Sequence, residues 1–210
     1  TKNSDKDIKP NTPIVLEVKN LCKKNNFKNI NFVLRKKEIL GITGLLGSGR
    51  TELATALFGI APSDSGQIII DNQPVCIKNV QQAVKNGIAY VPEDRLTQGL
   101  IMNYSQRENI SIAMLKNFKA SNGLIDEKKI TLTADKWIKT LKVKTDSMYK
   151  TVKTLSGGNQ QKIVLGKWLE MHPKVLILDG PTVGVDIGAK AGLFRTINEM
   201  VEATGMSVIL

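Results

Sequence analysis

The sequence predicts an α/β fold, and three features lead to this prediction. A short apolar run leads into a glycine-rich segment at 44–51, and a helix-forming run follows that segment. A second segment with glycines begins at Ser156, and it also precedes a helix-forming run. A near-continuous apolar strand later ends in the carboxylate of Asp179. Strand-length apolar runs that alternate with helical patterns are typical of α/β proteins.

The segment 44–51 has the pattern of a loop that binds phosphate. It follows the apolar run 38–43, which has the length of a buried strand, and it precedes a helical run over 51–58 that ends before Gly59. Bare backbone N–H groups and a helix N-terminus would therefore both face an anion. The pattern G-x-x-x-x-G-K-[ST] fits except that Arg50 replaces the lysine. The expected nucleotide-binding residues are Gly44, Gly47, Ser48, Gly49, Arg50 and Thr51.

The bulk composition is that of a globular protein. Of the 210 residues, 41% are hydrophobic, and the mean hydropathy is −0.11. No apolar run approaches the roughly 18 residues of a membrane-spanning helix, and the polar N-terminus predicts no signal peptide. Cys22 and Cys76 have neither disulfide nor metal spacing, so we expect reduced thiols that are buried or half-buried. These features predict a cytoplasmic protein.

The net charge of +11 is unevenly distributed along the chain. Residues 1–50 carry 11 Lys and Arg against 4 Asp and Glu, and residues 101–150 carry 10 against 5. Aromatic residues make up only 5% of the chain and do not alternate with the basic residues as they do in proteins that bind single strands. The charge therefore favours an anionic membrane surface or an acidic partner over a nucleic acid.

The other elements are predicted from apolar patterns and turn residues. Residues 1–13 are polar, contain two prolines and are expected to be a tail or a linker within a longer polypeptide. Asp71 and Asn72 are expected to form the turn of a hairpin. Strands are expected at 14–18, 27–34, 67–70, 74–77, 88–91 and 207–210, and helices at 80–86 and 187–203.

Residues 100–154 differ in character and are predicted to form a mainly helical insertion. Apolar residues recur at helical spacing among many lysines, which indicates helices with a solvated basic face. We expect most of the methionines and aromatic residues here to pack in the core. The recurring apolar residues are Met102, Ile110, Ile112, Met114, Leu115, Ile130, Leu132, Trp137, Ile138 and Leu141.

The segment 155–162 is predicted to be a second anion-binding loop. Ser156 is a good N-cap residue, and the two glycines after it expose the backbone amides of the following helix. We expect that helix to end near His172, before a strand that ends at Asp179. An acid at the carboxyl end of a parallel strand beside a phosphate loop is where Mg²⁺ would be held.

Together these segments resemble the ATP-binding cassette, the nucleotide-binding domain of ABC transporters. The matching motifs are the phosphate loop at 44–51, a Q-loop region at 90–95, the signature LSGGNQQK at 155–162, the strand-Asp-x-Pro-Thr segment at 174–182 and a D-loop at 184–186. The details GLLGSGRTEL, VPEDR, LSGGNQQK and VGVDIGAK look like the second cassette of simple-sugar importers, which fuse two cassettes in one polypeptide.

The resemblance implies the ABC ATPase fold, with a P-loop NTPase core, an antiparallel β subdomain and an inserted helical subdomain. The chain would end before the switch histidine of the family, because His172, the only histidine, precedes the Asp179 strand. The implied domains are a linker at 1–13, the first part of the core with the β subdomain at 14–99, the helical subdomain at 100–154 and the rest of the core at 155–210.

The resemblance also implies the ligands and the roles of the site residues. ATP would bind with Mg²⁺, and Thr51 and Asp179 would arrange the metal. Two cassettes pair head to tail in this family, so the signature would contact the partner's ATP. The signature residues are Leu155, Ser156, Gly157, Gly158, Asn159 and Gln160, and the Q-loop and D-loop residues are Glu93 and Asp186.

Three positions depart from the family pattern. Arg50 replaces the phosphate-loop lysine, Gly180 replaces the glutamate that orients the attacking water, and Glu93 replaces the Q-loop glutamine. A positioned acid–base group contributes about 10²- to 10⁴-fold to a rate, and glycine has no side chain for this role. We therefore expect no intact catalytic residue and impaired hydrolysis by the isolated domain. Phe27 is the nearest candidate for stacking on adenine, although the alternation around it favours a core position.

The implied function is that of the ATP-binding domain of a sugar importer. Its partners would be a second cassette fused upstream, transmembrane permease subunits and, indirectly, a sugar-binding protein, at the inner face of the cell membrane. Gly99–Tyr104, an apolar stretch, is a candidate groove for a permease helix. Two alternatives remain open: a regulatory cassette that senses nucleotide without turnover, and a non-transport ABC ATPase that acts on nucleic acid or ribosomes.

Overall fold

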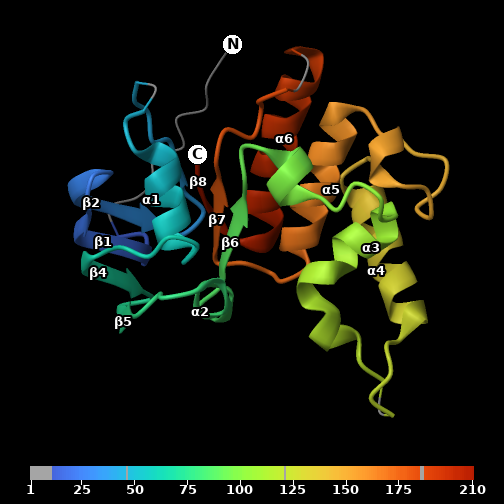
Figure 1. Ribbon diagram of the computed structural model, residues 1–210, viewed down its shortest axis with the longest axis horizontal. Coiled ribbons are helices and arrows are strands. Elements are labelled where there is room, and N and C mark those ends of the chain that lie inside the picture. The colour runs from blue at the N-terminus through green and yellow to red at the C-terminus, as the bar shows by residue number, and fades with distance from the viewer. Residues whose placement is uncertain (1–10, 46, 121, 185–186) are drawn as a thin grey trace. The chain divides into compact units, whose positions relative to one another are not determined.

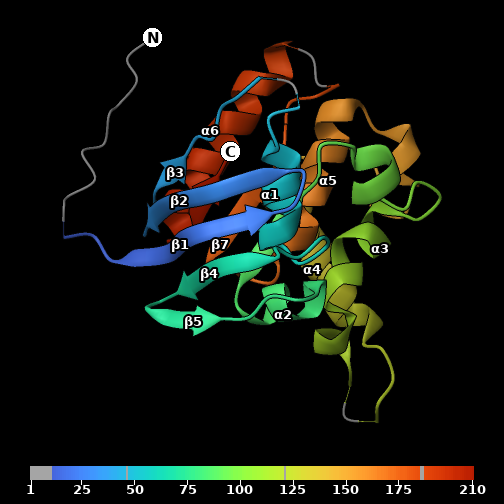
Figure 2. The ribbon, with the colours of Figure 1, turned by 60° about the vertical axis from the view of Figure 1, so that its left-hand side comes forward.

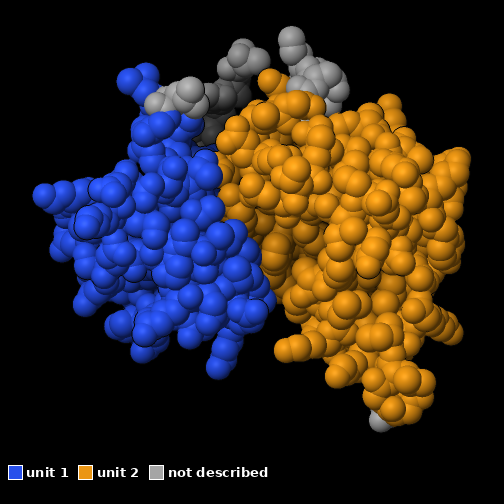
Figure 3. All heavy atoms as spheres, viewed as in Figure 1, with its two compact units in different colours: residues 1–88, 174–177, 201–210 blue, residues 89–173, 178–200 orange. Residues whose placement is uncertain are grey.

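The structure, a computed structural model, describes residues 11–45, 47–120, 122–184 and 187–210 (Figure 1). The chain forms two compact units, which are coloured separately in Figure 3. Unit 1 comprises Thr1–Ile88, Lys174–Ile177 and Val201–Leu210, and unit 2 comprises Ala89–Pro173 and Leu178–Met200. Both units are therefore built from segments that lie far apart in the sequence.

An antiparallel sheet with the strand order β2-β1-β4-β5 forms one part of unit 1 (Figure 2). The predicted hairpin is confirmed, because Asp71 and Asn72 link its two strands with φ angles of 48° and 63°, as a tight hairpin turn requires. The first strand is longer than predicted: it continues through a register shift after Val18 and reaches Lys23. The strands are β1 (Ile14–Lys23), β2 (Phe27–Arg35), β4 (Ser65–Ile70) and β5 (Gln73–Val75).

The second sheet has the strand order β3-β8-β7-β6. Its strands are β3 (Ile39–Leu40), β8 (Ser207–Ile209), β7 (Val175–Leu178) and β6 (Ile88–Val91). The last three are buried at every residue, as predicted for two of them from their apolar runs. The prediction of a buried strand over 38–43 is wrong, because β3 has two half-buried residues, and after it only the Ile42 N–H continues the ladder, to the Leu210 carbonyl.

The helices of unit 1 are α1 (Arg50–Leu57) and α2 (Val80–Lys85), and both end within one residue of the predicted position. After α1 the chain turns at Gly59, where φ is 77° and a Cβ atom would lie 2.5 Å from the Asn79 carbonyl oxygen. The Asn79 side chain in turn caps α2 by accepting a hydrogen bond from the Gln82 N–H at 2.9 Å. The buried residues of α1 include Leu53 and Leu57, which join the core of the unit.

Unit 2 is mainly helical, including most of the stretch from 106 to 140. Its helices are η1 (Arg95–Gly99), α3 (Gln106–Ser111), η2 (Ile112–Phe118), α4 (Glu127–Thr140), η3 (Val152–Thr154), α5 (Gly157–Leu169) and α6 (Ile187–Thr204), whose last turn belongs to unit 1. Helix α5 packs closely at Gly166, where a Cβ atom would lie 3.3 Å from Trp137 and 3.4 Å from Leu141. Trp137 and Phe118 are buried as expected, but Leu132 on α4 is 61% exposed. The expectation that most methionines and aromatic residues of this segment pack in the core is wrong, because the others are half-buried or exposed: Met102, Met114, Met148, Tyr104 and Tyr149.

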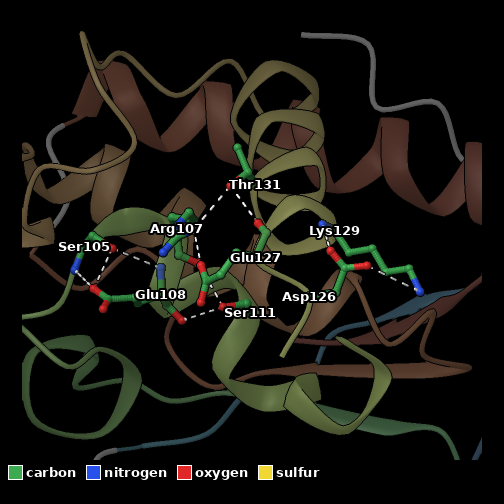
Figure 4. A network of polar contacts seen from close by, with 8 residues as sticks. All are labelled: Ser105, Arg107, Glu108, Ser111, Asp126, Glu127, Lys129 and Thr131. Atoms are coloured by element: carbon green, nitrogen blue, oxygen red, sulfur yellow. Dashed lines mark hydrogen bonds and ion pairs between the residues drawn. The ribbon is translucent and has the colours of Figure 1, made fainter. Parts of the chain in front are cut away.

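A polar network ties α3 to α4 (Figure 4). Ser105 and Glu108 form a capping box at the start of α3, with the Ser105 N–H donating to Glu108 Oε2 at 2.7 Å. Arg107 donates from Nη1 to Glu127 Oε2 at 2.6 Å and to Thr131 Oγ1 at 3.2 Å, both on α4. The insertion is therefore held by charged side chains as well as by its apolar core.

The expectations for the two cysteines and for the single histidine can be compared with the structure. Cys22 is a half-buried free thiol as expected, but Cys76 is exposed, because it lies just past the short edge strand β5. His172 follows α5 directly, and its N–H donates to the Leu169 carbonyl at 3.0 Å, which confirms the prediction of a histidine at a helix end. Within the described ranges, none of the helices is both long and apolar enough to span a bilayer.

Candidate functional site

The phosphate loop of unit 1 is exposed and leads directly into α1. The Ser48 N–H donates to the Leu45 carbonyl at 3.1 Å, which closes a turn in the loop. Gly47 and Gly49 have φ angles of 75° and 85°, in the left-handed region that favours glycine. Gly49 is the N-cap residue of α1, and no side chain caps this helix end. The loop therefore presents a helix start of the kind that binds anions.

The glycines of this loop are needed for two different reasons. A Cβ atom at Gly44 would lie 2.4 Å from Ser48 Oγ, and one at Gly49 would lie 2.8 Å from the Asn26 carbonyl oxygen. These two glycines allow the loop to pack against itself and against the start of β2. At Gly47, by contrast, nothing lies within 4 Å of the Cβ position. The backbone there borders open space, so the loop fits a phosphate group.

Arg50 and Thr51 occupy the first turn of α1, and both side chains are exposed. In the described part of the chain, Arg50 forms no ion pair with an acidic side chain. Its guanidinium stays charged at any physiological pH and is open to an anionic ligand. Of the six predicted nucleotide-binding residues, which follow one another closely along the chain, all except the buried Gly49 are exposed.

Phe27 lies beside the phosphate loop at the start of β2. Its Cβ atom would be 3.6 Å from a Cβ atom at Gly49. The half-buried ring lines an open pocket of about 570 Å³ together with residues 22–28 and Asp64, which include three lysines. Phe27 is therefore both part of the sheet and exposed to a pocket next to the loop, so its stacking on a base stays a prediction.

In unit 2, two contacts from β6 fix Asp179, the residue after β7. Its N–H donates to the Val91 carbonyl at 2.9 Å, and its Oδ2 accepts from the Tyr90 hydroxyl at 3.1 Å. Burial of Tyr90, followed by the neighbouring Asp179 carboxylate, raises the pKa of the Tyr90 hydroxyl, so it remains a donor at neutral pH. Sequence reasoning placed Tyr90 only at the start of the Q-loop region and did not predict its contact with Asp179, although its place near the end of a buried strand was a usable signal.

Gly180 follows Asp179 and occupies a position that favours glycine. Its φ is 53°, and a Cβ atom would lie 3.2 Å from Glu93 Cγ and 3.3 Å from Val183 Cγ2. The side chain of Glu93 therefore lies where a residue at 180 would begin its own side chain. The Glu93 carboxylate also adds, as the smallest of the causes, to the raised pKa of Tyr90, after burial and the Asp179 carboxylate.

The start of the signature differs from its prediction. Helix α5 begins at Gly157, so both glycines belong to the helix rather than to a loop. Ser156 is the N-cap residue, as predicted, but its hydroxyl accepts no hydrogen bond from the backbone of the first turn. That hydroxyl accepts a hydrogen bond from Asn159 Nδ2 at 3.0 Å, and Asn159 Oδ1 accepts from the Lys144 N–H at 2.9 Å. Because a backbone N–H can only donate, the orientation of the Asn159 amide is fixed.

Arg95 contacts the signature helix and the segment after Gly180. Its Nε donates to Gln160 Oε1 at 3.2 Å, and its two terminal nitrogens donate to the carbonyls of Val183 and Gly184 at 2.8 and 3.1 Å. Sequence reasoning placed Arg95 only as the end of the Q-loop region and did not predict these contacts. Asp186, the predicted D-loop residue, lies outside the described residues.

No cluster of three or more His, Cys, Asp or Glu residues that would cage a metal occurs among the described side chains. Magnesium at nucleotide sites needs no such cage, because one or two protein ligands and the phosphates of the nucleotide are sufficient. Thr51 belongs to unit 1 and Asp179 to unit 2, and both have the oxygen ligands that Mg²⁺ prefers. Each of these two side chains, taken by itself, therefore has a donor oxygen suited to a nucleotide-bound magnesium ion.

A glycine-rich strand–loop–helix unit in an α/β fold defines a P-loop nucleotide-binding protein. The chain belongs to the ABC transporter family, whose profile matches residues 27–183. This confirms the family that the motifs resemble and the ABC ATPase fold.

Relatives of known assignment are ATP-binding proteins of sugar import. The ribose import ATP-binding protein RbsA of Shouchella clausii is 45% identical over 98% of this chain and 41% of its own length. A putative ribose/galactose/methyl galactoside import ATP-binding protein of Pseudomonas savastanoi pv. phaseolicola is 46% identical over 96% of this chain and 38% of its own length. The chain thus spans about two fifths of these relatives.

Among solved structures, cbiO1 from Clostridium perfringens, part of the ABC transporter complex cbiONQ, has the same fold. It aligns with a TM-score of 0.76 and 26% identity, over 94% of this chain and 77% of its own.

Proposed function

We propose that this chain is the nucleotide-binding domain of a sugar importer, which binds ATP with Mg²⁺ to power the uptake of a ribose-type or galactose-type sugar. The observation that carries the proposal is the open, glycine-built phosphate loop in a chain homologous to ribose import ATP-binding proteins. The amides of 47–51 hold the β-phosphate, while Thr51 and Asp179 arrange the metal. Bound nucleotide supplies the phosphoryl-transfer chemistry, and the chain's residues position it.

The site on this chain's own phosphate loop is degenerate in this proposal. Arg50 is larger, planar and forked, so it binds phosphate in a geometry different from that of lysine. Gly180 has no group that orients water, and the Glu93 side chain fills the adjacent space. The site therefore binds nucleotide but hydrolyses it slowly, and the isolated 210-residue chain has little ATPase activity.

The signature, residues 155–160, completes the site of a second cassette. Asn159 donates to Ser156 Oγ, so the Ser156 hydroxyl hydrogen is directed elsewhere and is available to a phosphate oxygen. The start of α5 adds backbone amides and the positive end of a helix dipole. Most turnover therefore occurs where this signature meets the nucleotide of the partner cassette.

The whole protein acts with partners at the inner face of the cell membrane. These partners are a transmembrane permease and, indirectly, a sugar-binding protein. The second cassette lies in the same polypeptide, which accords with relatives about 2.5 times as long as this chain. Ile101 and Tyr104, 41% and 45% exposed, offer apolar surface to a permease helix, whereas Gly99 and Leu100 are buried.

ATPase measurements on the full-length protein with its permease test this division of labour. We expect Ser156→Arg to reduce turnover at least tenfold, because it blocks the partner's site, and Arg50→Ala to reduce it less. Asn117→Arg, at an exposed position of η2, is the matched control. The proposal fails if Ser156→Arg leaves turnover unchanged while Arg50→Ala abolishes it.

A second candidate function is a cassette that senses nucleotide without turnover. The observation that favours it is Gly180, which has no side chain and whose backbone lies in the left-handed region that favours glycine. In this alternative the full-length protein binds ATP with Mg²⁺, yet Ser156→Arg and wild type show the same absence of hydrolysis.

A further inference from the structure

Arg95 joins three segments of unit 2 that lie far apart in the sequence. It starts the short helix η1, directly after Glu93 and Asp94, and its guanidinium donates to the side chain of Gln160 and to two carbonyls, at 183 and 184. One planar group with donors in fixed directions thus sets the relative position of the Q-loop region, the signature helix and the turn after Gly180.

Gly157 and Gly184 lie against the Arg95 guanidinium, which leaves little space for a side chain at either position. A Cβ atom at Gly157, the first residue of α5, would lie 2.7 Å from Arg95 Nη2 and 2.8 Å from the Gly184 carbonyl oxygen. A Cβ atom at Gly184 would lie 3.1 Å from Arg95 Nη1. The signature helix can therefore begin where it does only because residue 157 leaves room for the arginine.

A second contact fixes the other end of η1 to the same helix. Lys167, 9% exposed on α5, donates from Nζ to the Gly99 carbonyl at 2.5 Å. Arg95 and Gly99, the first and last residues of η1, are thus both hydrogen-bonded to side chains of α5. A displacement of η1 is transmitted to α5 through these two contacts.

Arg95 forms no ion pair among the described residues, but the adjacent Asp94 carboxylate interacts with its charge: the pKa of Asp94 is lowered chiefly by the hydrogen bond from the Thr97 hydroxyl and in part by Arg95. All three hydrogen-bond acceptors of Arg95 are neutral. A cation beside the N-terminus of a helix adds to the positive end of the helix dipole, so the two together favour an anion there. The three hydrogen bonds keep Arg95 next to the segment that is to meet a phosphate.

We propose that Arg95 is a positioning residue, which aligns the start of the signature helix and the 183–184 turn so that both reach the nucleotide of the partner cassette. The inference rests on the proposed function in one respect, namely that the signature helix and the 183–184 turn contact the nucleotide of a partner cassette. The alignment itself concerns only contacts within unit 2, so it is measured separately.

The first experiment compares Arg95→Ala, Arg95→Lys and the control Arg195→Ala in the full-length protein without nucleotide. Arg195 is exposed on α6 and forms no ion pair among the residues described. Hydrogen bonds from a charged donor contribute enough that we expect the Gln160 and Val183 amides to exchange about tenfold faster in Arg95→Ala, by hydrogen–deuterium exchange. Equal exchange in Arg95→Ala and Arg195→Ala would overturn the proposal.

The second experiment measures vanadate-trapped ADP in the complete transporter. Trapping should fall about tenfold in Arg95→Ala, be partly restored in Arg95→Lys, and stay at the wild-type level in Arg195→Ala. If wild type itself traps no nucleotide, the proposed function fails, while the exchange comparison still decides the role of Arg95. Wild-type trapping in a folded Arg95→Ala protein overturns the positioning role alone.

A double-substitution cycle guards against a general loss of folding. Gly157→Ala crowds both Arg95 Nη2 and the Gly184 carbonyl oxygen, and Arg95→Ala removes only the first contact, so the loss of trapping caused by Gly157→Ala should be smaller, but not absent, in the Arg95→Ala background. Independent, multiplicative effects of the two substitutions would contradict a direct contact between these positions. Thermal melting of each variant shows whether it is folded. If a variant that contains Arg95→Ala is unfolded, Arg95→Lys takes the place of Arg95→Ala in the cycle with Gly157→Ala.

Discussion

The two glycine-containing segments of this chain, 44–51 and 155–160, are both proposed to contact a nucleotide phosphate, but their conformations are determined in different ways. In the phosphate loop, Gly47 and Gly49 adopt left-handed backbone angles, and Gly47 borders open space. At the signature, the glycines are part of a regular helix, and Gly157 is crowded by a side chain. The first segment is shaped by its backbone, whereas the second is shaped by the side chains around it.

This difference predicts where each segment is sensitive. The phosphate loop should lose affinity for nucleotide when a side chain is added to a glycine with a left-handed backbone, because the backbone conformation then has to change. The signature should fail when a supporting side chain such as Arg95 or Asn159 is altered, even though neither alteration touches the backbone. The predictions below run from the largest expected effect to the smallest.

Gly49→Ala should have the largest effect, on the phosphate loop. The new Cβ would lie 2.8 Å from the Asn26 carbonyl oxygen at a φ of 85°, so we expect a loss of about 1–3 kcal/mol of binding free energy, seen as roughly 5- to 150-fold weaker ATP–Mg²⁺ binding by titration. Gly192→Ala is the matched control, since α6 has open space there, and it should stabilise the fold by up to about 1 kcal/mol. Equal affinities in the two variants would contradict the strained loop.

Lys167→Met should change how stability depends on pH. Burial lowers the pKa of Lys167 from 10.5 to about 8, so the unfolded chain binds more protons between these values. The free energy of unfolding should therefore rise with pH above about 8, by roughly 2–3 kcal/mol up to pH 10, and Lys167→Met should lose this rise.

The matched control is Lys116→Met, at an exposed position of η2, which should keep the wild-type pH dependence. Urea unfolding at pH 7 to 10 measures all three proteins. Parallel curves for wild type and Lys167→Met would show that the buried amine does not titrate as described.

Asn159→Asp should reduce trapping at the partner's site about tenfold without unfolding the chain. Aspartate still accepts from the Lys144 N–H but cannot donate to Ser156 Oγ, so the Ser156 hydroxyl turns to donate to it instead. A charge-assisted hydrogen bond of this kind withdraws the hydroxyl from phosphate. Asn159→Ala, which leaves the hydroxyl free to rotate, should trap more ADP than Asn159→Asp; the reverse order would exclude this role.

Gly180→Glu should have the smallest effect, because it should not restore fast hydrolysis at this chain's own site. The new side chain would begin 3.2 Å from Glu93 Cγ at a φ of 53°, so Glu93 and the strained backbone would both have to adjust before its carboxylate reached the position that the family pattern gives it. ATPase activity should change by less than about twofold, since no barrier is lowered. A tenfold gain would indicate that the site lacks only this carboxylate.

Sequence reasoning was most successful where structure is set by neighbours along the chain. The Asp71–Asn72 turn, the buried strand at Ile88–Val91 and the helix end at Gly59 follow from local backbone preferences. The same reasoning missed the contacts of Tyr90 and Arg95, because their partners lie 65 to 89 positions away.

The Ser156 N-cap illustrates a second limit of the sequence. Serine before a helix favours a hydroxyl that accepts from the backbone of the first turn. Here Asn159, three residues later, donates to the Ser156 hydroxyl instead, and no side chain caps the start of the helix. The competition between two local hydrogen bonds depends on the Lys144 N–H, which only the tertiary fold brings to Asn159. Residue type and spacing alone therefore could not decide it.

The central claim is that the two glycine segments of one chain serve different nucleotides. An ATP–Mg²⁺ titration of the monomeric 210-residue chain tests it most directly, after circular dichroism has confirmed that each variant is folded. The account predicts that Arg50→Ala weakens binding about tenfold or more while Ser156→Arg leaves the affinity unchanged, since 1.4 kcal/mol is a factor of ten. Equal weakening by both substitutions would mean that one molecule holds one triphosphate with both segments, which contradicts the account.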